Sequence, residues 1–474
     1  MGYGLIAVAV FLWLFRYFRL IVNCLSHWTF KPIPVSAKPQ YTSQDVTIIL
    51  PTIATGGEEL ETTLSTCLKS EPYELLLVTV DSNAKILTDL ANRINANKIR
   101  VLSIREANKR RQMCRAIPEV TTKFTIFVDD DVAWPPKVLE WMLAPFEADD
   151  KMGGVGTSQR LRRRAKAAGI MEAMVDFLGA AYLERRNFDC SACLHIDGGL
   201  PCLSGRTVAY RSDILQDPAF THGFTHEVWN TMQLNADDDN FITRWMYAHD
   251  YKIAMQYHKE AEVQTTLESQ PKKYLSQCLR WVRSNWRSNL TSLFVEGHYW
   301  HTQPWSTYAV LQTTLTAWNF VWDPLNIYLW WTISAGWSEN DRFALRVFLV
   351  TWIYGFSKTV KLWGHFIRYP ADVVFVPVYI AFGYFHTLIK IYGLLTLSET
   401  TWGSRDGADT DNRVRMIRLP AYDSTTPDGR SSETFDYPLL QPSTTTEDQL
   451  PAYLPAYESH RRHQTPPFTN PYHD

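Results

Sequence analysis

The chain has 474 residues and a formal net charge of −2, with 14% aromatic residues and 18 tryptophans. This near-neutral charge excludes a protein whose whole surface is built to bind nucleic acid. The length exceeds that of one ordinary domain and allows a large buried core. Many tryptophans follow residue 280. Because tryptophan concentrates at membrane interfaces, the composition favours a membrane protein.

Four apolar stretches are long enough to be membrane spans, which need about 20 residues each. They cover residues 4–25, 305–335, 343–363 and 371–397. A cleaved signal peptide is the alternative for the first stretch. That stretch lacks a charged start and a small-residue cleavage site, which favours a retained anchor within residues 1–30. Basic residues follow the anchor and none precedes it, so we expect residues 38–300 in the cytosol.

Short apolar runs alternate with amphipathic stretches after residue 45. They predict strands over residues 46–50, 75–80, 99–104 and 124–128, and helices over 58–70, 83–96, 107–117 and 136–147. This alternation predicts an α/β domain over residues 40–300, with a mostly parallel sheet and helices on both faces. Ligands of such sheets bind beyond the carboxyl ends of the strands. We therefore expect Asp81 and Asp129, which follow the second and fourth strands, on the same rim.

The run Asp129-Asp130-Asp131 directly follows a predicted strand. Mg²⁺ and Mn²⁺ prefer carboxylate and phosphate oxygens as ligands. Asp129 and Asp131 are therefore predicted to hold such a metal together with a phosphorylated donor, while Asp130 points elsewhere. An acidic surface turn is the alternative. Asp81 is expected to bind a nucleotide, and capping of a helix is its alternative role.

A second acidic run, Asp237-Asp238-Asp239, opens a predicted helix. Crowding of carboxylates raises the pKa of at least one, which suits a general base, although acids at a helix start also complement the helix dipole. Gln277-Cys278-Leu279-Arg280-Trp281 lies on a predicted amphipathic helix over residues 272–290. We expect Arg280 to face a diphosphate and Trp281 a sugar ring. A basic helix resting on anionic headgroups is the alternative.

Two side-chain clusters leave alternatives open. A basic cluster, expected to contact phosphate or only solvent, comprises Arg105, Lys109, Arg110 and Arg111. A second group has an irregular zinc-like spacing, with buried thiols as the alternative, and comprises Cys190, Cys193, His195 and Cys202. Lys109 lies in the first cluster just before the acidic strand end, and we expect it to contact the donor.

Residues 405–474 are rich in Pro, Ser, Thr and Tyr and show no apolar period. This composition predicts a disordered tail. The tetrapeptide Leu-Pro-Ala-Tyr occurs three times, starting at Leu419, Leu450 and Leu454. Low-complexity drift is one explanation, and a recognition motif for an adaptor protein is the other.

The motifs taken together resemble the processive family 2 glycosyltransferases, which include the hyaluronan, chitin and cellulose synthases. The likeness is greatest to hyaluronan-synthase-like fungal synthases of capsule and cell-wall polysaccharides. The set covers residues 45–290 and comprises Asp81, Asp129-x-Asp131, Cys202-Leu203-Ser204-Gly205, Asp237-Asp238 and Gln277-x-x-Arg280-Trp281. Trp402-Gly403-Ser404-Arg405 is similar to the W-G-T-R gating segment of hyaluronan synthases, with Ser in place of Thr.

The resemblance implies a Rossmann-like GT-A domain flanked by N-terminal and C-terminal membrane helices, with the later helices and the gating segment in residues 301–404. It implies a membrane-embedded, inverting enzyme that uses a UDP-sugar and Mg²⁺ or Mn²⁺ to extend and export a cell-surface polysaccharide. The partners are then the UDP-sugar, the growing polysaccharide and membrane lipid, with no nucleic acid. The location implied is the plasma membrane, with the catalytic domain in the cytosol.

Roles for single residues follow from the resemblance. The general base is Asp238, the metal pair is Asp129 and Asp131, and Asp81, Asp129 and Arg280 bind the donor. The acceptor contacts are Cys202, Ser204, Gly205 and Trp281, and the gating residues are Trp402 and Arg405. Two other functions stay open, namely a glycolipid glycosyltransferase of the ceramide type and a catalytically silent membrane scaffold.

The chain also departs from the family pattern. It has one N-terminal span where hyaluronan synthases have two. Its base loop reads Ala-Asp-Asp-Asp in place of Gly-Asp-Asp-Arg, which leaves Asp237 and Asp239 as alternative bases. If residues 290 and 402 are both cytosolic, an even number of spans separates them, yet three stretches qualify. Either residues 305–335 are broken around Asp323-Pro324, or residues 371–397 lie in the interface.

Overall fold

The computed structural model describes residues 3–164, 169–230, 232–297, 299–315 and 318–400, all within one compact unit of the chain. The α/β domain contains a seven-stranded sheet, whose strand order is β11-β6-β8-β4-β1-β2-β3. Its strands are β1 (Val46–Pro51), β2 (Glu74–Val80), β3 (Ile99–Ile104), β4 (Phe124–Val128), β6 (Met152–Thr157), β8 (Thr207–Arg211) and β11 (Lys252–Gln256). The four strands predicted from the sequence are confirmed.

The direction of the strands determines where a ligand can bind. β1 pairs in parallel with β2 and β4, and β2 in parallel with β3, whereas β8 runs antiparallel to β4 and β6. The carboxyl ends of β1, β2 and β4 therefore meet at one edge of the sheet. A small sheet beside this edge joins β5 (Val132–Ala133), β12 (Val263–Thr265) and β7 (Gln159–Leu161).

The sheet is buried on both faces, as parallel strands require. In β1, Ile48 and Leu50 pack on one face and Ile49 on the other, and none of the three is exposed. The first face packs against α2 (Glu58–Leu68), α3 (Asp81–Asn95) and α5 (Val138–Ala148). The second packs against α4 (Lys109–Ala116), α7 (Ser212–Gln216), α8 (Pro218–His226) and α9 (Asp238–Ala248). The predicted α/β class with helices on both faces is confirmed.

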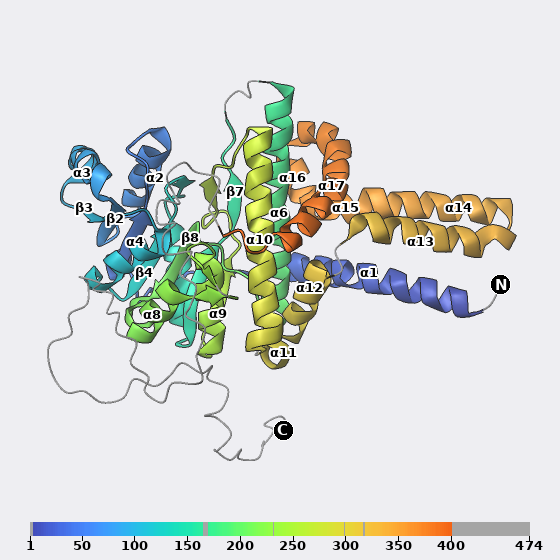
Figure 1. Cartoon of the computed structure of the whole chain (residues 1–474), viewed down its shortest axis with the longest axis horizontal. Helices are drawn as coiled ribbons and strands as arrows, with labels where there is room; N and C mark the ends of the chain where they lie inside the picture. The colour runs from blue at the N-terminus through green and yellow to red at the C-terminus, as the bar shows by residue number, and fades with distance from the viewer. Residues whose placement is uncertain (1–2, 165–168, 231, 298, 316–317, 401–474) are drawn as a thin grey trace, which may run out of the picture. The chain divides into compact units, whose positions relative to one another are not determined.

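Two long helices lie side by side between the sheet and the apolar helices (Figure 1). They are α6 (Ile170–Asp197) and α10 (Pro271–Thr291). The remaining α-helices are α1 (Tyr3–Thr29), α11 (Tyr299–Thr302), α12 (Pro304–Leu315), α13 (Asn319–Ile333), α14 (Glu339–Val350), α15 (Ser357–Thr359), α16 (Trp363–Arg368) and α17 (Val376–Leu395). In addition, β9 (Val228–Trp229) forms a short hairpin with β10 (Met232–Gln233). α10 carries the Q-x-x-R-W motif, so this motif faces the sheet domain from the side of the apolar helices.

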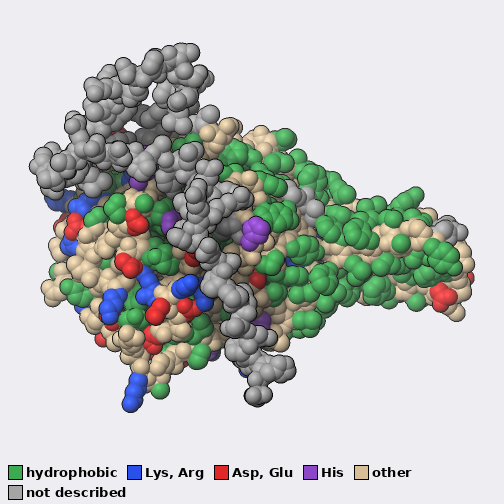
Figure 2. Space-filling view, turned by 90° about the horizontal axis from the view of Figure 1, so that it is seen from below, with side chains coloured by type: hydrophobic (Ala, Val, Ile, Leu, Met, Phe, Trp, Pro, Cys, Tyr) green, Lys and Arg blue, Asp and Glu red, His purple; other side chains and the backbone are tan. Residues whose placement is uncertain are grey.

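Three helical stretches among the described residues are long and apolar enough to cross a membrane. They are Tyr3–Thr29, Glu339–Arg368 and Pro370–Leu395. Figure 2 shows hydrophobic side chains over the helices that project from the sheet domain, and charged side chains gathered on the domain itself. Exposed residues of the projecting helices include Phe11, Phe18, Tyr328 and Phe343. Large exposed apolar surfaces of this kind suit contact with lipid.

The stretch 305–335 is broken, as one of the two topological alternatives predicted. The break precedes Asn319 and does not fall at Asp323-Pro324, because α13 continues through Pro324. α13 and α14 pack together with α1, through contacts such as Trp13 with Phe348 and Arg346 over Trp331. Among the described residues, the candidate spans that follow residue 290 are Glu339–Arg368 and Pro370–Leu395, which is an even number. The helix α17 of the second span packs along α10.

Candidate active site

A cavity of about 350 Å³ lies at the carboxyl-terminal edge of the parallel strands. Its walls come from the segments after β1 and β4, the start of α4, the loop before β8, the start of α9 and the middle of α10. Segments as far apart in sequence as Pro51 and Asn285 therefore share one site. The predicted residues that line it are Lys109, Asp129, Asp131, Cys202, Ser204, Gly205, Asp238, Arg280 and Trp281.

The three carboxylates after β4 have different surroundings. Asp130 is buried and accepts a hydrogen bond from the Thr52 hydroxyl at 2.6 Å. Asp131 accepts from the hydroxyl of Thr266 at 3.2 Å. Asp129 faces Lys109, whose Nζ lies 2.9 Å from its Oδ1. All three acids line the same cavity, and Asp130 differs from the other two in being buried and held by Thr52 at the end of β1.

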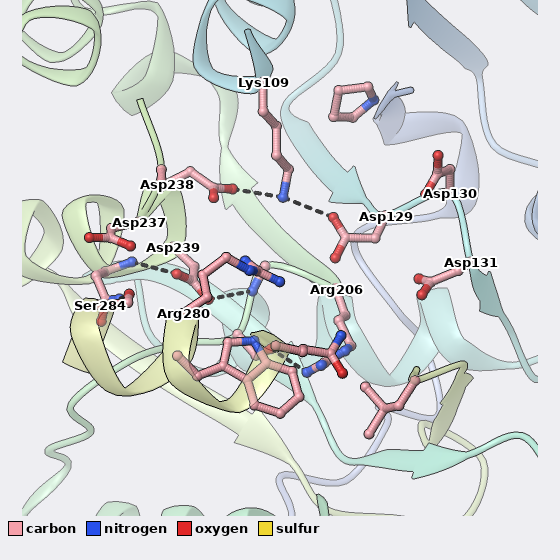
Figure 3. Close-up of a pocket in the computed structure, with 18 of the residues that line it drawn as sticks. Lys109, Asp129, Asp130, Asp131, Arg206, Asp237, Asp238, Asp239, Arg280 and Ser284 are labelled. Atoms are coloured by element: carbon pink, nitrogen blue, oxygen red, sulfur yellow. Dashed lines mark hydrogen bonds and ion pairs between the residues drawn. The ribbon is translucent and has the colours of Figure 1, made fainter. Parts of the chain in front are cut away.

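Lys109 lies between two carboxylates that are far apart in sequence. Its Nζ is 2.9 Å from Asp129 Oδ1 and 2.9 Å from Asp238 Oδ2, and Figure 3 shows the two acids approaching it from opposite sides. Burial lowers the pKa of a lysine, but these two carboxylates outweigh that effect and raise the pKa of Lys109. Lys109 is therefore a fixed positive charge at the centre of the cavity.

The three acids at the start of α9 are distinguished by their partners. Asp237 Oδ2 accepts from Nε and Nη2 of the buried Arg287, at 2.9 and 2.8 Å. Asp238 pairs with Lys109. Asp239 Oδ2 accepts from the backbone amide of Gly205 at 3.2 Å. Burial, reinforced by the nearby carboxylate of Asp238, raises the pKa of Asp239, as the crowding of acids predicts.

A buried arginine holds the loop that carries these acids. The Arg110 side chain is 1% exposed and donates to the carbonyl oxygens of Phe224 and Ala236 at 2.8 and 2.6 Å. It also forms an ion pair with Glu227 at 2.6 Å. Because Ala236 precedes Asp237, Arg110 fixes the backbone from which the acids project. Arg110, expected from the sequence to contact phosphate or solvent, is therefore a structural residue, and that expectation is wrong for it.

The Q-x-x-R-W motif contributes a cation and an aromatic face. Burial lowers the pKa of the Arg280 guanidinium, and the carboxylate of Asp237 opposes this shift. Trp281 stacks on Tyr182 of α6, with ring centroids 4.5 Å apart and an angle of 11° between the planes. Arg206 lies over the Trp281 ring at 5.7 Å. The indole is therefore held in one orientation at the wall of the cavity.

The Cys202-Leu203-Ser204-Gly205 loop is fastened from two sides. Arg186 of α6 donates to the carbonyl oxygen of Cys202 at 2.7 Å, and Gly205 donates its amide to Asp239. Burial, together with the charge of Asp239, raises the pKa of the Cys202 thiol. This thiol is therefore protonated and acts as a small neutral wall residue.

Some predicted residues lie elsewhere. Asp81 lies at the expected edge of the sheet, where it begins α3, but it does not line the cavity. Its side chain is exposed and accepts a hydrogen bond from the Ser103 hydroxyl at 2.6 Å. Trp402, Arg405 and the Leu-Pro-Ala-Tyr repeats fall outside the described residues. Sequence reasoning missed Tyr182, Arg206 and the role of Arg287, because nothing local marks their contacts with residues about 50 to 100 positions away.

The described residues contain no cluster of three or more His, Cys, Asp or Glu side chains arranged for a metal ion. The zinc-like group is not assembled, since Cys190 and Cys193 are buried in α6 and His195 is exposed. Asp129 and Asp131 still suit Mg²⁺ or Mn²⁺, because these ions accept one or two protein carboxylates and complete their shell with phosphate oxygens and water.

Comparisons with known proteins identify the family of the chain. A family model described as glycosyltransferase like family 2 matches residues 44–284. The chain is 65% identical over 470 residues to a type 2 glycosyltransferase of Zymoseptoria tritici, covering 97% of this chain and 96% of that one. It is 50% identical over 410 residues to a type 2 glycosyltransferase of Gibberella zeae, covering 86% and 77%.

More distant likenesses are also found. The hyaluronan synthase of Streptococcus pyogenes is 21% identical over 396 residues, covering 78% of this chain and 85% of that one. Among solved structures, the mannosyltransferase PcManGT of Pyrobaculum calidifontis, in complex with GDP-Man and Mn²⁺, aligns with a TM-score of 0.49 and 14% identity, covering 85% of this chain and all of that one. From the family match and the two near relatives, this chain belongs to the family 2 glycosyltransferases.

Proposed function

We propose that the chain is an inverting, metal-dependent synthase that extends a cell-surface polysaccharide from a UDP-sugar at the plasma membrane, with its catalytic domain in the cytosol. The observation that carries the proposal is that one cavity collects Asp129 and Asp131, the carboxylate of Asp238 and the indole face of Trp281. These are the groups needed to hold a sugar nucleotide, to take a proton and to support a sugar ring.

The donor would bind at the side of the cavity formed by β4 and α4. Asp129 and Asp131 would hold Mg²⁺ or Mn²⁺, which when bound neutralises the charge of the departing diphosphate. Lys109 and Arg280 line the same cavity and supply positive charge to the phosphate oxygens. Asp81, at the neighbouring strand end, would contact the nucleoside at the rim.

The acceptor would lie between Trp281 and the start of α9, with the Cys202–Gly205 loop beside it. The oxygen of the acceptor hydroxyl bonds to the anomeric carbon from the face opposite the diphosphate, while the Asp238 carboxylate takes the proton of that hydroxyl. The bond from the anomeric carbon to the diphosphate oxygen breaks, and UDP departs. All three acids have partners, since Asp237 pairs with Arg287, Asp238 with Lys109, and Asp239 accepts from the Gly205 amide. We assign the role to Asp238 because it matches the position of the general base in the family that the chain resembles.

Isolated membranes that contain the full chain provide the test, with each radiolabelled UDP-sugar supplied in the presence of Mg²⁺ or Mn²⁺. We expect UDP release together with a polymer that organic solvent does not extract. Asp238→Asn should lower the rate more than about tenfold, a loss of about 1.4 kcal/mol or more of transition-state stabilisation. Asp250→Asn is the matched control, since Asp250 is exposed and its positive φ of 58° is tolerated by Asn.

Two results would contradict the proposed function, and a third would remove one residue's role. A lipid-extractable product would identify a glycolipid enzyme. Absence of UDP release from every donor would identify a silent scaffold. Near-normal polymer synthesis by Asp238→Asn would leave the family function intact but remove Asp238 as the base.

A further inference from the structure

A buried network of four charged side chains joins the helix that begins at Lys109 to the helix that begins at Asp238. Its members are Arg110 of α4, Glu227 between α8 and β9, Arg244 of α9, and Glu296 in the turn after α10. The two arginine side chains are 1% and 6% exposed, and that of Glu227 is 13% exposed. None of the four lines the catalytic cavity. The network can therefore influence the site only through the segments that it holds.

Glu227 is the member that both arginines share. Its Oε2 accepts from Arg110 Nη2 at 2.6 Å, and its Oε1 accepts from Nη2 of Arg244. Arg244 also donates through Nε to Glu296 at 2.9 Å and through Nη1 to the Ser288 hydroxyl of α10 at 2.8 Å. The network thus contains two positive and two negative charges, and it connects α4 and α9 with α10 and the turn that follows α10.

Arg110 connects the network to both partners of a catalytic ion pair. It donates to the carbonyl oxygen of Ala236, which lies two residues before Asp238. In the chain it directly follows Lys109, whose Nζ is 2.9 Å from Asp238 Oδ2. The backbone segments that carry these two side chains therefore meet at one guanidinium, and Glu227 holds that guanidinium in place.

The sheet holds α4 independently of this network. The side-chain amide of Gln112 in α4 donates to the backbone carbonyl oxygens of Thr52 and Val78, near the ends of β1 and β2, at 3.0 and 2.8 Å. The acids predicted to bind the donor follow β4 directly, so the sheet places them as well. A change in the network should therefore displace Asp238 more than the groups on the donor side of the cavity.

Stability alone does not require charged groups at this place. Aromatic side chains already join α8 to α9, through Phe220 against Trp245 and Phe224 against Phe241, with ring centroids 5.5 and 5.6 Å apart. Replacing a buried ion network with apolar side chains of similar volume is often neutral or stabilising. What the charged groups add is direction, because the forked donors of arginine fix the orientation of the carboxylate that they bind.

We propose that Glu227 is a positioning residue for the transfer step, because through Arg110 and Arg244 it sets the place of the Asp238 carboxylate relative to the donor. The inference rests on the proposed function, since it takes Asp238 as the base. A misplacement of about 1 Å in an active site can lower the rate about a hundredfold. Disturbing the geometry of the network should therefore lower turnover and leave donor affinity unchanged.

Two variants test this role while keeping every charge. Glu227→Asp shortens the side chain by one methylene group, so that its carboxylate no longer reaches both arginines. Arg110→Lys keeps the positive charge, but a single ammonium cannot reproduce the forked contacts of Arg110 with Glu227 and two carbonyl oxygens. We expect kcat to fall at least about tenfold in each variant, while KM for the UDP-sugar and metal-dependent affinity for UDP change less than about twofold.

The same two substitutions at a second ion pair are the matched controls. Arg115 of α4 pairs with Glu119 at 2.9 Å, and both side chains are partly exposed, outside the cavity and the network. Arg115→Lys and Glu119→Asp should therefore keep the native kcat. All variants are compared as purified full chains in detergent, by turnover, UDP affinity and thermal unfolding.

The possible outcomes separate this inference from the proposed function. Turnover in both test variants within about twofold of the controls would overturn the positioning role. A loss of UDP affinity equal to the loss of kcat, or a loss of folded protein in both test variants, would show that Glu227 serves the stability of the domain, and would overturn it too. If the native chain transfers sugar from no donor, the proposed function is wrong, and this inference with it.

Discussion

The ion pair between Arg287 and Asp237 links the acids at the start of α9 to the end of the described residues. Both side chains are buried, at 3% and 6% exposure. Arg287 donates twice to Asp237 Oδ2, and its Nη1 also donates to the carbonyl oxygens of Leu397 and Glu399, each at 3.2 Å. Asp237 directly precedes the proposed base, and Glu399 lies three residues before Trp402.

Removing one partner of this pair should be far more harmful than removing both. Arg287→Met leaves a buried, uncompensated carboxylate, which costs about 3–5 kcal/mol, whereas replacing both partners with apolar groups is often close to neutral. At about 2.1 cal/mol/K of unfolding entropy per residue, a folded unit that spans Met1–Ile417 changes its melting temperature by about 1 °C per kcal/mol, so Arg287→Met should lower it by roughly 3–6 °C. The double variant Arg287→Met with Asp237→Leu should recover most of that loss.

Thermal unfolding of the detergent-solubilised full chain measures the effect, and turnover is measured below the lowest melting temperature. Arg283→Met is the matched control one turn earlier on α10. Arg283 donates only to the Thr396 hydroxyl among the described residues, at 3.0 Å, so its loss should cost about 1 kcal/mol. We expect neither the double variant nor Arg287→Met to recover normal turnover, because the loop before Asp238 and the segment 397–399 lose their common anchor.

Strict additivity would refute this reasoning. If the double variant is as destabilised as the sum of the two single variants, the two charges are not coupled. Normal turnover in a folded Arg287→Met would show that the anchor does not position the base.

Three further predictions concern the dependence on a metal ion, the gating segment Trp402-Gly403-Ser404-Arg405, and the side of the membrane on which α10 lies. Asp131→Ala should abolish activity and metal-dependent UDP affinity, and full turnover of the native chain in excess chelator would disprove metal dependence. Trp402→Ala and Arg405→Lys should each severely lower polymer synthesis at normal expression, because Ala cannot pack the segment into the site as Trp can, and Lys cannot reproduce the forked donors of Arg. Wild-type rates in both variants would indicate that Trp402 is only an interfacial anchor and Arg405 only a residue flanking the membrane on the cytosolic side. The Asn289-Leu290-Thr291 sequon should be unmodified, because it follows the Q-x-x-R-W motif on the side expected to be cytosolic; Asn289 Nδ2 also donates to the Thr314 hydroxyl at 2.7 Å. A glycosidase-sensitive mobility shift that vanishes in Asn289→Gln would overturn the cytosolic placement.

Local features of the sequence were sufficient to predict the elements of the α/β domain. The strand over 46–50 is apolar apart from Thr47 because both of its faces are buried, and the Asp129 run follows its strand directly. Such signals depend on neighbours within a few positions, which the amino-acid order displays. The shared edge of Asp81 and Asp129 was likewise predictable, since parallel strands end on one side.

Tertiary packing decided which of these residues meet. Only the fold brings Lys109 between Asp129 and Asp238, and stacks Tyr182 on Trp281, 99 positions away. The same packing excludes Asp81 from the cavity and joins Arg110, Glu227 and Arg244 from three segments in one network. Contacts at such separations depend on how whole elements pack, and no local period or motif records them. The sequence by itself therefore determined the elements and the chemical groups, and the tertiary structure determined their partners.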